Sequence, residues 1–441
     1  MKIDFKKTVR KLFVPSVFLA GIVFGNFLAD SSFLEKMGRQ LKVWIYPVIS
    51  PVSLLLKDSG AERKAWQDYY YYSKPIDDRL IEAFGDPLEL YEPLGYRYES
   101  VGNTEFLAGF LPIDDYPYEK SITSEMDFFT GPMMQVTQEN LAAEYSPTDY
   151  ESIIEKQLGI HNLEFGEITY VVSTLVDENK EFRINFIELT YSNGPIIQFY
   201  LAEPLISSNH RTMLALHGCS SSPDNIFALS DHDYTNYLGL EALQRGWTVI
   251  APYILNKCDW LENFNVLGEY TTGATEYGYE LEKIHRIKEF YKENYGETIH
   301  DVYGISYGAQ LALLYSALDE SLEKMIYSGA MNFDIYTYGL NRVLNFSEEI
   351  DFESSSAIYQ YFEPNDLFKE FLSRKNTRLV LEIGAYDAAK KIDNGIIAEN
   401  IEISEWCMDK INNCRERLFI NFFKGYHEAN PEPSLDFLMA E

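Results

Sequence analysis

The stretch YGISYGAQLALLYSALDE, residues 303–320, places a serine between two glycines and then continues as an apolar run of helical character. Ser306 is the central residue of this G-x-S-x-G pattern, which Gly304 and Gly308 frame. Glycine and serine are common residues, so the pattern alone also fits a chance glycine-flanked turn. Whether Ser306 is a nucleophile therefore depends on the elements around it and on its chemical partners.

The chain around this stretch alternates between strand and helix patterns from about residue 165 onward. Short apolar runs indicate strands, and longer amphipathic runs indicate helices. We expect strands in 167–176, 184–204 (two, joined at Asn193-Gly194), 212–218, 248–255, 299–306, 322–330, 378–387 and 418–428, and helices in 237–247, 279–296, 309–320 and 400–418. This alternation predicts an α/β fold, with a mostly parallel sheet, helices on both faces and an antiparallel hairpin at one edge.

Ser306 lies where one of these strands ends and a helix begins. Ligands bind at the carboxyl ends of strands in such sheets, and a nucleophile elbow needs this strand–turn–helix context. Glycines at 304 and 308 leave room for the tight turn. The backbone N–H of Tyr307 would then face the site as an oxyanion donor.

A serine hydroxyl needs a base, and the base needs a carboxylate to hold its tautomer. Of the seven histidines, only His427 lies beyond Ser306 and just after a strand. Asp387 ends the strand between them, and Asp334 is the rival acid. The alternatives are a strand-end cap for Asp387 and a surface loop for His427.

A second turn, His217-Gly218-Cys219, closes another expected strand. The N–H of Cys219 or Ser220 would supply the second oxyanion donor. His217 precedes the nucleophile, so we expect it to be structural rather than the base.

Taken together, these segments resemble the α/β-hydrolase superfamily, in which the order along the chain is also Ser, Asp, His. The likeness covers roughly residues 185–441 and is greatest to acetyl-xylan-esterase-like and dienelactone-hydrolase-like proteins. It rests on LALHGCSSSPDNI (214–226), the opening stretch with its Ala317-Leu318-Asp319, Ser328-Gly329, RLVLEIGAYD (378–387) and FFKGYHE (422–428). Two departures are Ser306, where dienelactone hydrolases proper use cysteine, and Ala309, where many members have a second glycine.

The composition excludes some partners. A net charge of −31 argues against nucleic acid, whose phosphates need a basic face, and against docking of the folded part on an anionic membrane. Four cysteines form no C-x-x-C pair, and Cys407 and Cys414, seven apart on an expected helix, are interpreted as packing rather than a bridge. Asp231-His232-Asp233 is interpreted as a solvated turn, so we expect no metal and no cofactor.

The N-terminus predicts a membrane connection. Residues 1–11 carry five basic residues against one acidic residue, and the mostly apolar run 12–29 follows. This pattern is typical of a signal anchor or a cleaved signal peptide, with a buried soluble helix as the weaker alternative. Either of the first two would place the rest of the chain outside the cytoplasm, periplasmic or extracellular.

A chain of 441 residues favours two domains. We assign 30–164 to an accessory region without a recognisable role and 165–441 to a catalytic domain, with an aromatic lid at 333–372 whose alternative is ordinary helical packing. The predicted function is a serine hydrolase that cleaves small-molecule carboxylic esters through Ser306, Asp387 and His427. A prolyl-oligopeptidase-like peptidase and a non-catalytic scaffold are the alternatives.

Overall fold

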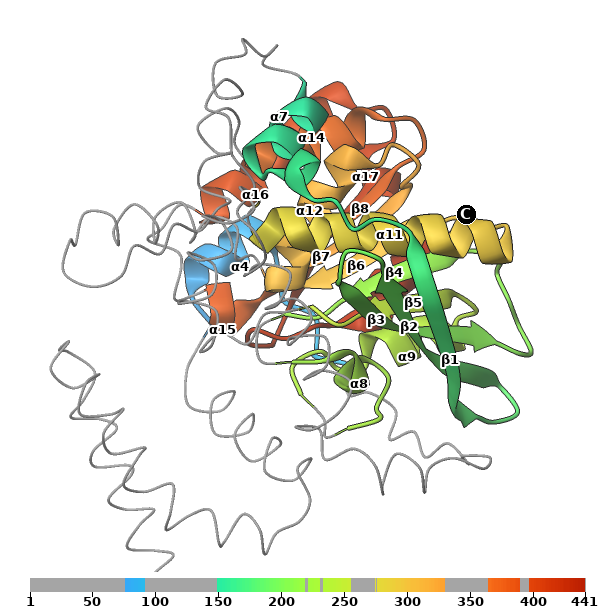
Figure 1. Cartoon of the computed structure of the whole chain (residues 1–441). Coiled ribbons are helices and arrows are strands. Elements are labelled where there is room, and N and C mark those ends of the chain that lie inside the picture. Colours follow the sequence, from blue (N-terminus) through green and yellow to red (C-terminus); the bar gives the residue numbers. More distant parts are fainter. Residues whose placement is uncertain are drawn as a thin grey trace, which may run out of the picture. The chain divides into compact units, whose positions relative to one another are not determined.

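A computed structural model describes residues 76–91, 149–218, 221–230, 233–254, 274, 276–329, 364–388 and 396–440 (Figure 1). All of them belong to one unit, Lys74–Glu441. The predicted anchor at 12–29, most of the accessory region and residues 333–363 of the predicted lid lie outside the described residues. Among the helices that are described, none is both long enough and apolar enough to cross a membrane.

The described strands form a single sheet in the order β1-β2-β3-β5-β4-β6-β7-β8-β9. β1, β2, β3 and β5 pair in antiparallel fashion, and the strands from β5 to β9 pair in parallel. The expected mostly parallel sheet with an antiparallel edge is thus confirmed, and Asn193-Gly194 does turn β2 into β3. The bounds are β1 Ile168–Glu178, β2 Phe182–Tyr191, β3 Ile196–Pro204, β4 Thr212–Leu216, β5 Thr248–Pro252, β6 Asp301–Ile305, β7 Lys324–Ser328, β8 Arg378–Gly384 and β9 Leu418–Phe423.

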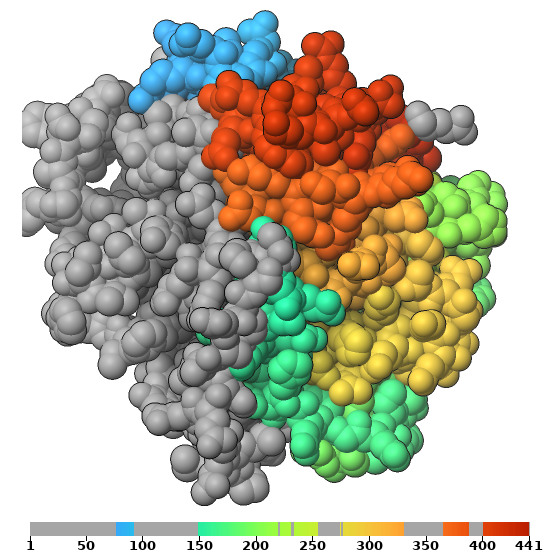
Figure 2. Space-filling view, turned by 90° about the horizontal axis from the view of Figure 1, so that it is seen from above, coloured from blue at the N-terminus to red at the C-terminus, as the bar shows by residue number. Residues whose placement is uncertain are grey.

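Helices cover both faces of this sheet (Figure 1). Because successive side chains of a strand point to opposite faces, β6 contributes Val302 to one apolar layer and Tyr303 and Ile305 to the other. The first layer contains α7 Tyr150–Gln157, α11 Glu276–Tyr295, α12 Tyr307–Leu318, α14 Pro364–Ser373 and α16 Ile396–Lys410, and Figure 2 looks onto it. The second contains α8 Pro223–Ile226, α9 Leu238–Gln244 and α18 Pro431–Met439.

Part of the accessory region packs against the same sheet. Helix α4, Asp78–Phe84, buries Leu80 against Ile383 and Phe422 of the last two strands, and lies beside the C-terminal segments in Figure 2. Beyond this helix, the N–H of Leu88 donates to the carbonyl of Phe422 at 2.8 Å. Leu88 therefore adds one isolated parallel bridge to the sheet edge formed by β9.

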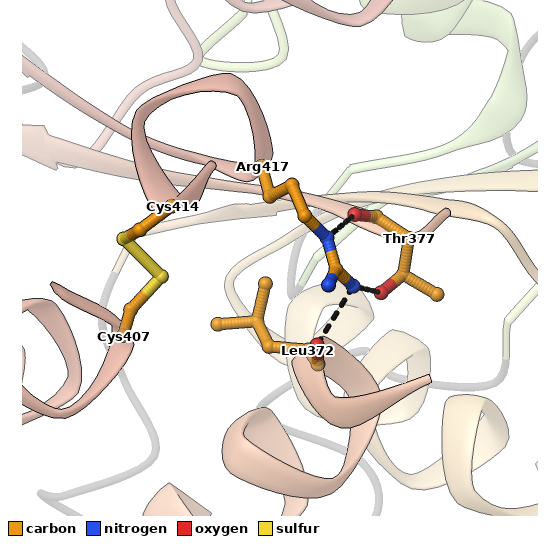
Figure 3. Close-up of a disulfide and its surroundings, with 5 residues drawn as sticks. All are labelled: Leu372, Thr377, Cys407, Cys414 and Arg417. Carbon is orange, nitrogen blue, oxygen red and sulfur yellow. Dashed lines mark hydrogen bonds between the residues drawn. A yellow bond between two sulfur atoms is a disulfide. The ribbon is translucent and has the colours of Figure 1, made fainter. Parts of the chain in front are cut away.

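Cys407 and Cys414 form a disulfide, so the interpretation of these cysteines as unbridged packing residues was wrong (Figure 3). Their Cα atoms lie 5.6 Å apart, whereas seven residues of unbroken helix would separate them by about 10 Å. The expected helix over 400–418 is in fact interrupted: α16 ends at Lys410, and α17, Cys414–Arg417, begins after Asn413 in left-handed backbone. This break brings the two sulfur atoms together.

Arg417, three residues after Cys414, caps the C-terminal end of α14. Its guanidinium donates to the carbonyl of Leu372 at 2.7 Å and to the carbonyl of Thr377 at 2.9 Å (Figure 3). Carbonyl groups in the last turn of a helix have no partner within that helix. Arg417 therefore caps α14 and ties it to the segment that carries the disulfide.

Candidate active site

Ser306 forms the sharp turn between β6 and α12. Its backbone has φ 58° and ψ −121°, a combination that costs energy for any residue except glycine. The turn is held from both sides, because the N–H of Ser306 donates to the carbonyl of Ser328 and the N–H of Ala309 donates to the carbonyl of Ser306, each at 3.0 Å. The residue is 3% exposed. This is the geometry of a nucleophile elbow.

The two glycines of the motif are required by close packing. A Cβ at Gly304 would lie 2.2 Å from the carbonyl oxygen of Gly308. A Cβ at Gly308 would lie 2.4 Å from the carbonyl oxygen of Leu216 at the end of β4. No side chain fits at such distances, so the expected reason for glycine at both positions is confirmed.

Asp387 and His427 are in direct contact. Asp387 lies in α15, Ala385–Ala388, which follows β8 without a break, and His427 lies in the loop after β9. Oδ2 of Asp387 is 2.9 Å from Nδ1 of His427, and their side chains are 14% and 30% exposed. The ring of Tyr234 packs against the imidazole, with centroids 5.9 Å apart. The pair is therefore partly shielded while the imidazole stays accessible.

Gly329, the residue after β7, lies close to both His427 and Ser306. A Cβ at Gly329 would lie 3.0 Å from Cε1 of His427 and 3.5 Å from the backbone nitrogen of Ser306. Both residues thus border the same glycine. Within the described part of the chain, no hydrogen bond joins the Ser306 hydroxyl to His427. The structure therefore brings Asp387 and His427 into contact and places Ser306 beside them.

Tyr307, which was predicted to supply one oxyanion donor, follows Ser306 directly. Tyr307 is the first residue of α12, and its ring packs against that of Tyr277 with centroids 4.9 Å apart. Cys219 and Ser220 lie outside the described residues. The turn that leads to them is close to the elbow, because a Cβ at Gly218 would lie 2.6 Å from Cβ of Ser306.

His217 is structural, as expected. Its Nε2 accepts a hydrogen bond from the backbone N–H of Ile254 at 3.1 Å, so its Nδ1 carries the proton and donates to the carbonyl of Gly218 at 2.9 Å. Complete burial lowers the pKa of His217 to about 4. The ring is therefore a neutral link between the segments after β4 and β5, with both nitrogens in use.

The predicted lid at 333–372 and the residues 231–233 are each described only in part. The described part of the predicted lid is α14, where Leu367 and Phe368 are buried in the core, as in the alternative of ordinary packing. Asp233 accepts hydrogen bonds from Ser221 and Thr235, while Asp231 and His232 lie outside the described residues. No cluster of three or more potential metal ligands occurs among the residues that are described.

Sequence reasoning missed two residues near the pair formed by Asp387 and His427. Glu382 lies in β8, the strand that leads to Asp387, and Tyr234 packs its ring against His427. Glu382 is a buried carboxyl that accepts hydrogen bonds from Tyr303 and from the segment after His427. One signal was available, because a glutamate interrupts the otherwise apolar run LVLEIG, residues 379–384 of β8. Tyr234 has no comparable signal in its local sequence.

Three features define an α/β-hydrolase-like fold. They are the strand order, the serine at the elbow after β6, and the carboxylate–histidine pair formed by the segments after β8 and β9. No protein-family model matches the chain, and no curated protein matches it.

Solved structures with a similar chain path include two acetyl xylan esterases. The enzyme from Paenibacillus sp. R4 has 15% identity and a TM-score of 0.44, over 69% of this chain and 98% of that chain. The enzyme from Thermoanaerobacterium sp. JW/SL YS485 has 15% identity and a TM-score of 0.41, over 70% and 97%. A protein assigned as a dienelactone hydrolase from Klebsiella pneumoniae subsp. pneumoniae MGH 78578 has 13% identity and a TM-score of 0.32, over 62% and 99%.

Proposed function

We propose that this protein is a serine hydrolase that cleaves carboxylic esters. The observation that carries the proposal is the hydrogen-bonded pair of Asp387 and His427, which lies next to a serine in elbow geometry. A strained elbow alone supports a tight turn, and a carboxylate–histidine pair alone supports a structural contact. Their occurrence around one glycine, at the carboxyl ends of parallel strands, supports nucleophilic catalysis.

In the proposed reaction, Nε2 of His427 takes the proton from Oγ of Ser306 as Oγ bonds to the ester carbonyl carbon. The carboxylate of Asp387 keeps the proton of His427 on Nδ1 and stabilises the imidazolium that forms. The tetrahedral intermediate then collapses, the alkoxide leaves with the proton from His427, and an acyl-enzyme remains on Ser306. Water, deprotonated by His427, attacks the acyl carbon and releases the carboxylic acid and the free serine.

The negative oxygen of the tetrahedral intermediate needs donors that are already in place. We assign this role to the backbone N–H groups of Tyr307 and Cys219. The position of Tyr307 at the start of α12 supports the first assignment, because the amides of a first helical turn point toward the N-terminal end of the helix. The closeness of Gly218 to Ser306 supports the second.

A fluorophosphonate probe tests the proposal, since it labels a serine only when the hydroxyl is activated. The full-length protein should be labelled at Ser306, as peptide mass mapping would show, and Ser306→Ala should not be labelled. A wild-type protein that stays unlabelled would contradict the enzyme proposal. Short-chain acyl esters tested beside aminoacyl-peptide substrates then separate an esterase from the prolyl-oligopeptidase-like alternative.

We also propose that the catalytic unit works outside the cytoplasm. The disulfide between Cys407 and Cys414 supports this location, because such bonds persist mainly in oxidising compartments. Residues 1–29 support delivery by a signal anchor or a signal peptide. Sequencing the mature N-terminus distinguishes these two: a start near Ser32 means cleavage, and an intact N-terminus in the membrane fraction means an anchor. An intact N-terminus in the cytosol, with both cysteines reduced, would contradict the location.

A further inference from the structure

Glu382 is a buried carboxyl in the middle of β8, and it is 1% exposed. Its side chain accepts hydrogen bonds from the hydroxyl of Tyr303 at 2.8 Å, from the backbone N–H of Asn430 at 3.2 Å and from the hydroxyl of Ser434. Burial raises the pKa of this carboxyl, and the hydrogen bonds oppose that shift. A carboxyl removed from water is costly unless such partners are present, so this group is held by a specific set of neighbours.

Each of these neighbours belongs to a segment that carries one of the proposed catalytic residues. Tyr303 lies in β6, three residues before Ser306. Asn430 lies three residues after His427, at the start of α18. Glu382 itself precedes Asp387 by five residues in the strand that ends at α15. One carboxyl therefore links the three segments whose ends meet at the site.

The backbone of Glu382 adds a fourth link. Its carbonyl accepts a hydrogen bond from the N–H of Gly329 at 3.3 Å. Gly329 is the residue that both His427 and Ser306 border. Glu382 thus connects through its side chain to the segment after His427 and through its carbonyl to the glycine beside the imidazole.

The segment after His427 is fixed further by Asn430. Its Nδ2 donates to Oδ1 of Asn421 on β9 at 3.2 Å, and Nδ2 of Asn421 donates to the carbonyl of Asn430 at 3.0 Å. Its Oδ1 accepts the N–H of Tyr91 at 2.8 Å. Asn430, at the end of the loop that carries His427, is therefore fixed by several hydrogen bonds and has little freedom to move.

We propose that Glu382 is a positioning residue for the hydrolytic site, and that it sets the location of His427 relative to Ser306 by joining β6, β8 and the start of α18. The inference rests on the proposed function. Glu382 does not touch substrate; it acts through the segments that it holds. The competing explanation is that Glu382 only stabilises the fold, by capping α18 and pairing with Tyr303.

Tyr303→Phe separates these explanations, because it removes the link from Glu382 to the nucleophile's strand and leaves the ring in place. The matched control is Tyr315→Phe, on α12. Tyr315 is a second buried tyrosine whose hydroxyl donates to a carboxylate, Asp319, at 2.9 Å. Both variants lose one hydrogen bond to a carboxyl group, so both should lose comparable stability.

The readouts are kcat, KM and the rate constant for fluorophosphonate labelling of Ser306, with urea unfolding measured in parallel. We expect Tyr303→Phe to lower kcat and the labelling rate by about tenfold or more with KM little changed, since misplacement of reacting groups by 1 Å can cost about 10²-fold. Tyr315→Phe should stay within about twofold of wild type. Glu382→Gln, which keeps one acceptor oxygen, should fall between wild type and Glu382→Leu.

Two results would show that Glu382 has no positioning role. If Tyr303→Phe and folded Glu382→Gln label at the wild-type rate, or if Tyr315→Phe loses as much activity as Tyr303→Phe, Glu382 has only a structural role. If Glu382→Leu does not fold, the tyrosine pair still decides the matter. Absence of labelling in the wild-type protein would instead contradict the proposed function, and so is distinguishable from failure of the positioning role.

Discussion

Gly329 lies directly against the ring of His427: a Cβ on this glycine would stand 3.0 Å from Cε1 and 3.3 Å from Nδ1 of the imidazole. The glycine also has a φ of 82°, which L side chains rarely adopt. We predict that Gly329→Ala displaces the imidazole and lowers kcat for ester hydrolysis by about tenfold or more. The left-handed backbone adds a stability cost of about 1–2 kcal/mol.

Gly85 provides the matched control for this substitution. It ends α4 with the same φ of 82°, and nothing lies within 4 Å of the position that a Cβ would take. Gly85→Ala should therefore lose stability in urea unfolding through backbone strain alone and keep wild-type kcat. Equal kcat in the two variants would mean that Gly329 leaves room for an alanine beside His427.

Asp387→Asn tests the role of the carboxylate. The amide has nearly the same shape but its NH2 group can donate a hydrogen bond to Nδ1 of His427, which places the ring proton on Nε2, the wrong tautomer for a base. We expect kcat to fall by roughly 10³–10⁴-fold, with a smaller effect on unfolding free energy because asparagine fills the same space and can still form a hydrogen bond to the ring. Steady-state hydrolysis of a short acyl ester measures this. A loss of less than tenfold would favour another acid, and Asp334→Asn is the variant to compare.

Ser306→Gly and Ser306→Ala separate catalysis from backbone strain. Both variants lack the hydroxyl and should be inactive and unlabelled by fluorophosphonate. The backbone angles of 58° and −121° suit glycine and strain alanine. We therefore expect the glycine variant to be more stable than the alanine variant by about 1 kcal/mol or more in urea unfolding. Equal stability would show that the elbow relaxes when the serine is replaced.

The sheet and the order of the candidate residues were predictable from sequence. Buried parallel strands appear as mainly apolar runs, and β6 and β8 are such runs apart from the charged residue that begins each strand and Glu382 within β8. Residues that follow such strands must meet at one edge of the sheet, so Ser306, Asp387 and His427 could be selected by position alone. Their chemical types then led to the prediction of nucleophilic catalysis.

The links between distant segments were not predictable in this way. Tyr303 and Glu382 are 79 positions apart, and no local spacing signals that their side chains meet. The contact between Leu88 and Phe422 joins residues that are even more remote in sequence. The disulfide was missed because a helical pattern was extended across Ile411-Asn412-Asn413, where the helix in fact ends. Asn413 adopts left-handed backbone there, which asparagine tolerates better than most residues.

His217 makes the stability of the fold depend on pH. The folded protein holds this ring neutral, with a pKa of about 4, whereas the unfolded chain protonates it below the ordinary value of 6.5. Between these two values the unfolded state binds more protons, so stability falls as the pH is lowered from 6.5 to 4. The expected loss of unfolding free energy over this pH range is about 3 kcal/mol.

Urea unfolding at pH 7, 5.5 and 4 measures this loss. His217→Asn is the test variant, and His210→Asn, at an exposed position, is the control. The His217 variant should lose less stability on acidification than wild type, while the His210 variant should follow wild type. Parallel curves for all three proteins would show that the buried ring takes up its proton without unfolding.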